Sequence, residues 1–107
     1  MILNACAMIL YNVTVKIDKD IQADWLQWMR SEHIPAVMAT GKFTEYRICR
    51  MLHEEEDGKT YAVQYFCPDM ETFYQYQQEH AARLQQEHKK RYEGRYVSFR
   101  TLMEVIE

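Results

Sequence analysis

Apolar and polar side chains alternate almost without interruption from residue 8 to residue 17, a pattern typical of a β-strand with one covered face. Less regular alternation over residues 42–53, 60–67 and 95–106 predicts three further strands. Before the third strand, Asp57-Gly58 indicates a hairpin turn, and the acidic residues ahead of it indicate an exposed loop. The side chains of the first strand that we expect to face the helices are Ile9, Tyr11, Val13, Val15 and Ile17.

A first helix is predicted after the first strand, with Asp20 as its N-cap. Pro35 lacks a backbone N–H and its ring clashes with the carbonyl four residues earlier, so we expect this helix to end near His33. A short helical segment over residues 35–40 then ends at Gly41, which can adopt the left-handed terminating conformation. The residues that recur at helical spacing are Ile21, Trp25, Trp28, Met29 and Glu32.

A second, longer helix is predicted between Pro68 and Gly94, with Asp69 as its N-cap. Its Lys89-Lys90-Arg91 triplet lies in the last turns, where cations complement the helix dipole, so we interpret it as a helix end and not as a binding patch. The residues that recur at threes and fours are Phe73, Tyr76, Gln77, His80, Leu84 and His88.

The resulting order βαββαβ predicts an α+β, ferredoxin-like fold, in which a four-stranded antiparallel sheet carries two helices on one face. The other face would expose Leu10 beside Asn12 and Thr14, a mixture for which open water is an unnatural setting. Two copies that pack sheet against sheet would cover it, as in a dimeric α/β barrel. We therefore expect a homodimer formed through the sheet faces.

The chain has 107 residues, which favours a single domain over residues 8–107. Met1-Ile2-Leu3 recurs as Met8-Ile9-Leu10, so we expect residues 1–7 to be a flexible extension and translation to begin at either methionine. The formal net charge of −3 gives no reason to expect nucleic acid or an anionic membrane as a partner. No apolar run approaches the roughly 20 residues that span a bilayer.

Cysteine usage indicates the cellular compartment. Cys6, Cys49 and Cys67 are an odd number without CxxC spacing, which favours free thiols in a reducing cytoplasm. A cross-strand pair between Cys49 and Cys67 would need a suitable register, and we do not expect it.

With these elements placed, the chain from Met8 onward resembles DUF4286, a small bacterial family of unknown function that is common in Bacteroidetes. The resemblance implies the fold of dimeric α/β barrels, a superfamily that includes cofactor-free antibiotic-biosynthesis monooxygenases, haem-degrading enzymes, muconolactone isomerases and amino-acid-sensing modules. It carries no catalytic assignment to any residue of this chain. The segments that carry it are Tyr11-Asn12-Val13-Thr14-Val15, Trp25-x-x-Trp28-Met29, Glu32-His33-Ile34-Pro35, Thr40-Gly41-Lys42-Phe43, Tyr61-x-Val63-Gln64-Tyr65 and Phe99-Arg100-Thr101.

His33 is the sharpest candidate for chemistry, because an imidazole beside a helix break could act as a general base or meet a ligand. It could equally cap the helix by bonding a carbonyl. His80 and His88 are eight residues apart on one helix, about 12 Å along its axis, so they cannot easily share a metal ion. No metal site and no cofactor are predicted.

The remaining candidate ligand-binding residues are polar or aromatic. Asn12 and Gln64 could line a barrel interior and bind a small polar ligand, or could satisfy one another across strands. Trp28, Tyr46 and Tyr61 could form aromatic walls, or could be ordinary core and dimer residues.

Two function classes follow from these residues. One is a small-molecule-binding or structural module with no established activity. The alternative is a cofactor-independent monooxygenase or isomerase, in which His33 manages protons while an apolar barrel cleft excludes water. An open pocket of a few hundred cubic ångströms that contains His33 would favour binding or catalysis, and a pocket filled by side chains would favour a structural role.

Overall fold

The computed structural model describes residues 7–53 and 55–107, so residues 1–6 of the predicted extension, Cys6 among them, lie outside the described residues. Within the described chain, one antiparallel sheet has the strand order β2-β3-β1-β4. The predicted order of helices and strands is confirmed. The strands are β1 (Ile9–Asp18), β2 (Glu45–Arg50), β3 (Gly58–Cys67) and β4 (Tyr96–Glu104).

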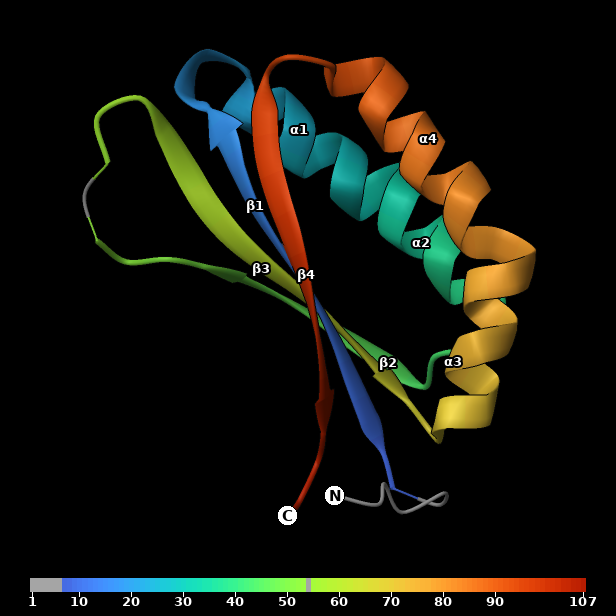
Figure 1. Cartoon of the computed structure of the whole chain (residues 1–107). Coiled ribbons are helices and arrows are strands. Elements are labelled where there is room, and N and C mark those ends of the chain that lie inside the picture. Colours follow the sequence, from blue (N-terminus) through green and yellow to red (C-terminus); the bar gives the residue numbers. More distant parts are fainter. Residues whose placement is uncertain (1–6, 54) are drawn as a thin grey trace.

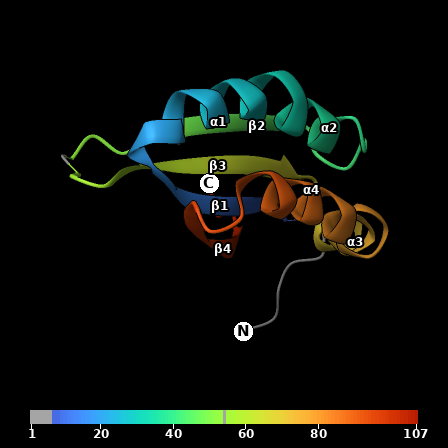
Figure 2. The ribbon, with the colours of Figure 1, turned by 90° about the horizontal axis from the view of Figure 1, so that it is seen from above.

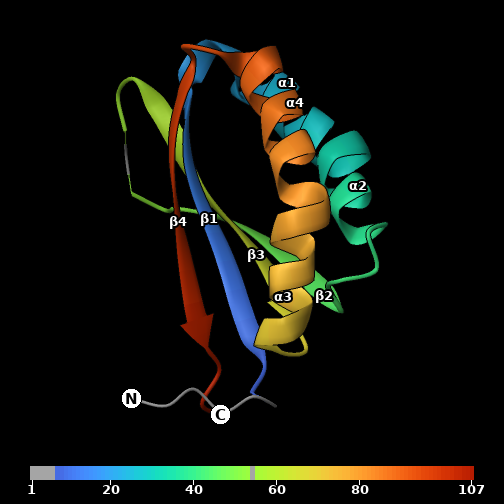
Figure 3. The same cartoon turned by 45° about the vertical axis from the view of Figure 1, so that its right-hand side comes forward.

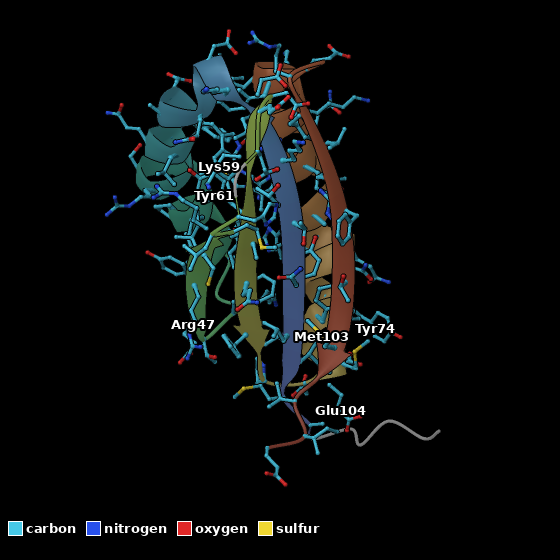
Figure 4. The ribbon with its side chains drawn as sticks, turned by 90° about the vertical axis from the view of Figure 1, so that its left-hand side faces the viewer. Arg47, Lys59, Tyr61, Tyr74, Met103 and Glu104 are labelled. Carbon is cyan, nitrogen blue, oxygen red and sulfur yellow. The ribbon has the colours of Figure 1, made fainter. Side chains whose placement is uncertain are left out.

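Helices cover one face of this sheet, and in the described residues the other face carries none (Figures 1 and 3). The first helical stretch, with α1 (Gln22–Trp28) and α2 (Ile34–Met38), lies over the side of the sheet nearer β2. The second, with α3 (Met70–Tyr76) and α4 (Ala82–Tyr92), lies over the side nearer β4 (Figures 2 and 4). Both stretches are therefore in position to bury the same sheet face.

The predicted helix break at Pro35 is wrong. His33 and Ile34 both have helical dihedrals, with φ of −70° and −61°. A π-helical segment, Met29–His33, joins α1 to α2, and the Ile34 N–H donates to the Met29 carbonyl five residues back. Pro35 then lies in the first turn of α2, where a missing N–H is tolerated. His33 consequently lies inside a continuous helical stretch and not at a helix end.

The ends of the helices agree with the prediction at three of four positions. Asp69 is the N-cap of α3, and its Oδ1 accepts from the Thr72 N–H at 2.8 Å. Gly41 and Gly94 both have positive φ, 76° and 77°, after the helices that precede them. Asp20 is not an N-cap: its carboxylate pairs with Arg95 instead.

The β2–β3 hairpin closes through a longer loop than the Asp57-Gly58 signal predicts. Gly58 is the first residue of β3, and a Cβ there would lie 2.7 Å from the Ile17 carbonyl oxygen, so close backbone approach and not a tight turn requires glycine. The Glu55 side chain ties this loop to β3, because it accepts hydrogen bonds from both the backbone N–H and the hydroxyl of Thr60. The expectation of a wholly solvated acidic run is therefore wrong at Glu55.

The hydrophobic core lies between the helices and the sheet. Ile9, Val15 and Ile17 of β1 are buried there, which confirms the predicted facing of the first strand. Trp25 is fully buried, with its ring centroid 5.0 Å from that of Tyr61 on β3. Cys49 and Cys67 are free thiols and form no disulfide with each other. In the strand register Cys49 lies opposite Ala62 and Cys67 lies opposite Ile9, so the two thiols lie on opposite faces of the sheet.

Candidate functional site

A small cavity lies between the helix-facing side of the sheet and the helices, and it encloses about 40 Å³. That is room for about three water molecules, well short of the few hundred cubic ångströms expected of a binding pocket. Its walls are largely apolar, with Val13 and Val63 from the sheet and Leu84 from α4. The polar side chains that line it are Tyr11, His33, Tyr65, Tyr76, Gln85, His88, Ser98 and Arg100.

Two histidines lie side by side at this cavity, His33 from the first helical stretch and His88 from α4. Their ring centroids are 5.8 Å apart, and the His33 ring stacks on Trp28 at 5.0 Å. His88 Nε2 accepts from Trp25 Nε1 at 2.9 Å, which requires an unprotonated Nε2. Both imidazoles are thus held among aromatic rings, in positions that favour the neutral form.

Burial lowers the pKa of both histidines. For His33 burial is the main cause and the nearby Arg100 charge adds to it, giving a pKa of about 4. For His88 burial again comes first, followed by His33 and Arg100, and the pKa is also about 4. At neutral pH each ring therefore carries one N–H and one nitrogen lone pair, and the lone pair of His88 is already used to accept from Trp25.

His33 has an unmet hydrogen-bonding need. Its Nδ1 is buried and has no hydrogen-bond partner within residues 7–53 and 55–107. The predicted capping role assumed a helix end at His33, and the helix continues through it. A buried polar atom without a partner is uncommon in folded proteins and marks a place where a water or a ligand would be held.

Arg100 brings a positive charge to the same cavity from β4. Its Nε donates to the Tyr11 hydroxyl at 3.0 Å. Burial raises the pKa of the Tyr11 phenol, and the Arg100 charge opposes that rise. Burial likewise raises the pKa of the Tyr65 and Tyr76 phenols well above their ordinary value. The cavity is thus lined by neutral donors and acceptors with one cation beside them.

The six predicted ligand-binding residues lie in different parts of the molecule. His33 lines the cavity, and Trp28 supports it by stacking on the imidazole. Tyr61 is buried in the core behind Trp25. Tyr46 is exposed on β2, at an outer groove beside α1.

The other two predicted residues, Asn12 and Gln64, are direct neighbours across β1 and β3 on the sheet face without helices. Asn12 donates to Thr14 at 3.0 Å on the same strand. The six therefore do not form one site in the described chain, and ligand binding by each stays a prediction.

Sequence reasoning missed Tyr11, His88 and Arg100 as members of the site. Arg100 carried an incomplete signal: it alternates with Val97, Phe99 and Thr101 and must face the opposite way, but alternation does not say which of the two faces meets the helices. Only the register with β1 places this arginine on the helix side of the sheet. His88 carried a weaker signal, since its helical spacing alone suits any core residue.

Neither a metal site nor a membrane-spanning helix is found among the described residues. In residues 7–53 and 55–107, no three His, Cys, Asp or Glu side chains gather closely enough to hold a metal ion. Among the helices of that same part of the protein, none combines the length and apolar character needed to cross a membrane.

A family model described as a domain of unknown function, DUF4286, matches residues 8–106. No curated protein matches the chain.

Solved structures with the same fold are distant in sequence. A conserved protein of unknown function from Bacteroides thetaiotaomicron VPI-5482, described as a possible oxidoreductase, has a TM-score of 0.70 at 13% identity, covering 94% of this chain and 100% of that one. An EthD-like protein from Ralstonia eutropha JMP134 has a TM-score of 0.69 at 16% identity, covering 94% of each chain. A dimeric ferredoxin-like protein from an uncultured marine organism has a TM-score of 0.66 at 11% identity, covering 92% of this chain and 95% of that one. These similarities confirm the predicted ferredoxin-like α+β fold.

Proposed function

The chain belongs to the DUF4286 family, and we propose that it is a homodimeric module that binds a small molecule in the cavity between its sheet and its helices. The observation that carries the proposal is the lining of that cavity. A purely structural core would be expected to fill such a space with apolar side chains or to satisfy its polar atoms internally. Here His33 Nδ1 is buried without a partner in the described chain, and Arg100 lines the same cavity.

The proposed dimer interface is the sheet face without helices. Val97 and Phe99 on β4 are 68% and 63% exposed there, and Met103 lies on the same strand face (Figure 4). Exposed apolar side chains on one sheet face favour burial against another surface. A second copy is the occupant we propose, in line with the dimeric ferredoxin-like relative. Asn12 and Gln64 would then lie between the two sheets.

We further propose a cytoplasmic location in a bacterium of the Bacteroidetes. Cys49 and Cys67 are both free thiols, which suits a reducing compartment. The bacterial assignment rests on the family resemblance alone.

The catalytic alternative, a cofactor-independent monooxygenase or isomerase, stays a prediction. The structural relatives share the fold at 11–16% identity. Fold by itself does not determine chemistry, so this likeness adds no reaction to the site.

Native mass spectrometry of the freshly purified protein tests the binding function. We expect a small-molecule mass on the native wild-type protein that is lost on denaturation. Val13→Phe puts a ring into the cavity and should abolish that adduct, whereas Leu52→Phe adds a ring at a 94% exposed residue outside the cavity and should keep it. Equal native and denatured subunit masses, together with no thermal shift in a fragment screen, would instead support a structural role.

A further inference from the structure

Arg100 differs from the other arginines of the described chain in lying at the cavity. Arg95 pairs with Asp18 and Asp20, and Arg91 lies near Asp24. No carboxylate of residues 7–53 or 55–107 lies within 4.0 Å of the Arg100 guanidinium, which is also true of Arg30, Arg47, Arg50 and Arg83, but none of those four lines the cavity. Arg100 is exposed to solvent and therefore brings a cation without a carboxylate partner in the described chain to the mouth of the cavity.

The orientation of Arg100 leaves part of its hydrogen-bonding fork available. Its Nε donates to the Tyr11 hydroxyl, which fixes the guanidinium at the sheet side of the cavity. A guanidinium has five N–H donors, so its two terminal nitrogens can still donate to a pair of acceptor atoms. The planar fork matches a carboxylate, whose two oxygens can accept in parallel.

The positive charge of Arg100 reaches the polar groups across the cavity. It lowers the pKa of His33 and of His88, although burial is the larger cause for both. It also opposes the burial-driven rise in the pKa of Tyr76. These groups are neutral, so none of them pairs with the exposed Arg100 guanidinium, which is left available to an anion at the cavity mouth.

The dimensions of the site limit what the anion can be. The enclosed volume of about 40 Å³ admits a short group of about three heavy atoms. Outside it, a groove between β4 and α4 shares Gln85, Ser98 and Arg100 with the cavity and gives access from the surface. The second cation of this groove, Lys89, does not line the cavity, so a doubly charged phosphate would meet only one cation inside.

We propose, on the basis of the binding function above, that the ligand is a small organic carboxylate whose carboxylate group is bound by Arg100 and whose short remainder enters the cavity toward His33. The valine and leucine walls would contact the carbon chain. The unpartnered His33 Nδ1 would bond a polar substituent on it. The carboxylate would thus pair with the Arg100 guanidinium, and the carbon chain would fill the remaining space.

The test is an NMR titration of the ¹⁵N-labelled full chain with propionate and with propionamide, which has the same size but no charge. At constant ionic strength, we expect propionate to give saturable shifts at the Arg100 Nε–H and the His33 ring. Propionamide should bind at least about tenfold more weakly, the difference typical of a charge-assisted hydrogen-bond pair. Inorganic phosphate should also bind more weakly than propionate.

Variants of Arg100 test whether this side chain is the one that binds propionate. Arg100→Gln should weaken propionate binding by about tenfold or more, and Arg100→Lys should bind with intermediate strength. Arg30→Gln makes the same charge change on an exposed residue outside the cavity and should leave binding unchanged. The propionate–propionamide comparison in the wild-type protein needs no variant, so it decides the question even if Arg100→Gln fails to fold.

The outcomes separate the two proposals. Equal binding of propionamide and propionate, or tighter binding of phosphate, would overturn the carboxylate assignment while the small-molecule function stands. Should neither propionate nor propionamide bind, and native mass spectrometry show no adduct, the binding function itself is overturned.

Discussion

On β4, apolar and polar side chains are distributed between the two sheet faces differently from those on β3. On β3 the apolar side chains Tyr61, Val63 and Tyr65 face the helices and are buried. On β4 the pattern is reversed: Arg100, opposite Val13, faces the helices, and Phe99, opposite Thr14, faces away. In its central part the edge strand thus presents Ser98 and Arg100 to the helix layer and Val97 and Phe99 to the face without helices.

This reversal accounts for both proposed sites at once. Because β4 points Ser98 and Arg100 toward the helices, the cavity gains a cation that the other strands do not provide. Because the alternate residues are Val97 and Phe99, the other face gains an exposed apolar strip. A strand of opposite polarity at the sheet edge is what we would expect if its outer face is buried against another copy.

The largest effect on stability should come from a substitution in the core between the sheet and the helices. Trp25 is fully buried and its indole N–H bonds His88, so Trp25→Ala should lower the free energy of unfolding by about 3–5 kcal/mol. Leu52, which is 94% exposed, is the matched control, and Leu52→Ala should change it by less than about 0.5 kcal/mol. Urea denaturation measures both, and an unchanged midpoint for Trp25→Ala would contradict the assignment of the core.

A second prediction uses the two neutral histidines of the buried face. Their pKa values of about 4 lie below the ordinary 6.5, so the unfolded chain binds more protons and stability rises with pH across this window. Stability should be fully present above pH 6.5 and be lost as the pH falls toward 4. Between pH 6 and pH 5 the loss should be about 2 kcal/mol for the pair.

Urea denaturation at several pH values checks this dependence. His33→Gln should remove about half of the loss between pH 6 and pH 5, since only His88 then remains. His53→Gln, which changes an exposed histidine in the β2–β3 loop, should leave the dependence unaltered. A pH profile identical in wild type and His33→Gln would show that His33 is not held neutral by burial.

A substitution on the sheet face without helices should have the smallest effect on the stability of the folded subunit, but it should abolish assembly. Phe99→Glu adds a charge to an exposed position, so the unfolding free energy of a subunit should change by less than about 0.5 kcal/mol. In the proposed dimer the same charge would be buried, and the particle should fall from twice 13.0 kDa to 13.0 kDa. Light scattering at micromolar concentration measures this change.

Tyr74→Glu is the control for assembly, because Tyr74 is 54% exposed on α3 and lies away from the face without helices (Figure 4). It should leave the particle size as in the wild type. A wild-type particle of 13.0 kDa would reject the homodimer altogether.

Local signals in the sequence were reliable where the cause of the structure is local. Asp69 caps its helix through its own carboxylate, and Gly41 and Gly94 adopt the left-handed conformation after their helices. The Pro35 signal failed because a π-helical segment, which composition does not reveal, lets the helix continue past the proline. Gly58 was misjudged for a similar reason, since the approach of the Ile17 carbonyl comes from another strand.

The candidate site was predicted only in part. His33 was identified as a candidate, but the reason given, a helix end, is not the reason it matters: its Nδ1 lacks a partner beside His88 and near Arg100. Asn12 and Gln64 were grouped correctly with one sheet face, and the aromatic candidates Trp28 and Tyr61 were placed no further than a wall or a core. Residues 33, 88 and 100 are far apart in the chain, and only packing brings them to one cavity.

The sequence by itself determined the order of the elements, the division of each strand into two faces and the family, because alternation and helical spacing are properties of neighbouring residues. Only the tertiary structure decided which face of β4 meets the helices. That choice follows from pairing Val13 with Arg100 across β1 and β4, and a shift of one residue would exchange the faces. Register is a contact between distant parts of the chain, so the position of the Arg100 charge, and with it the proposed site, depends on the folded arrangement.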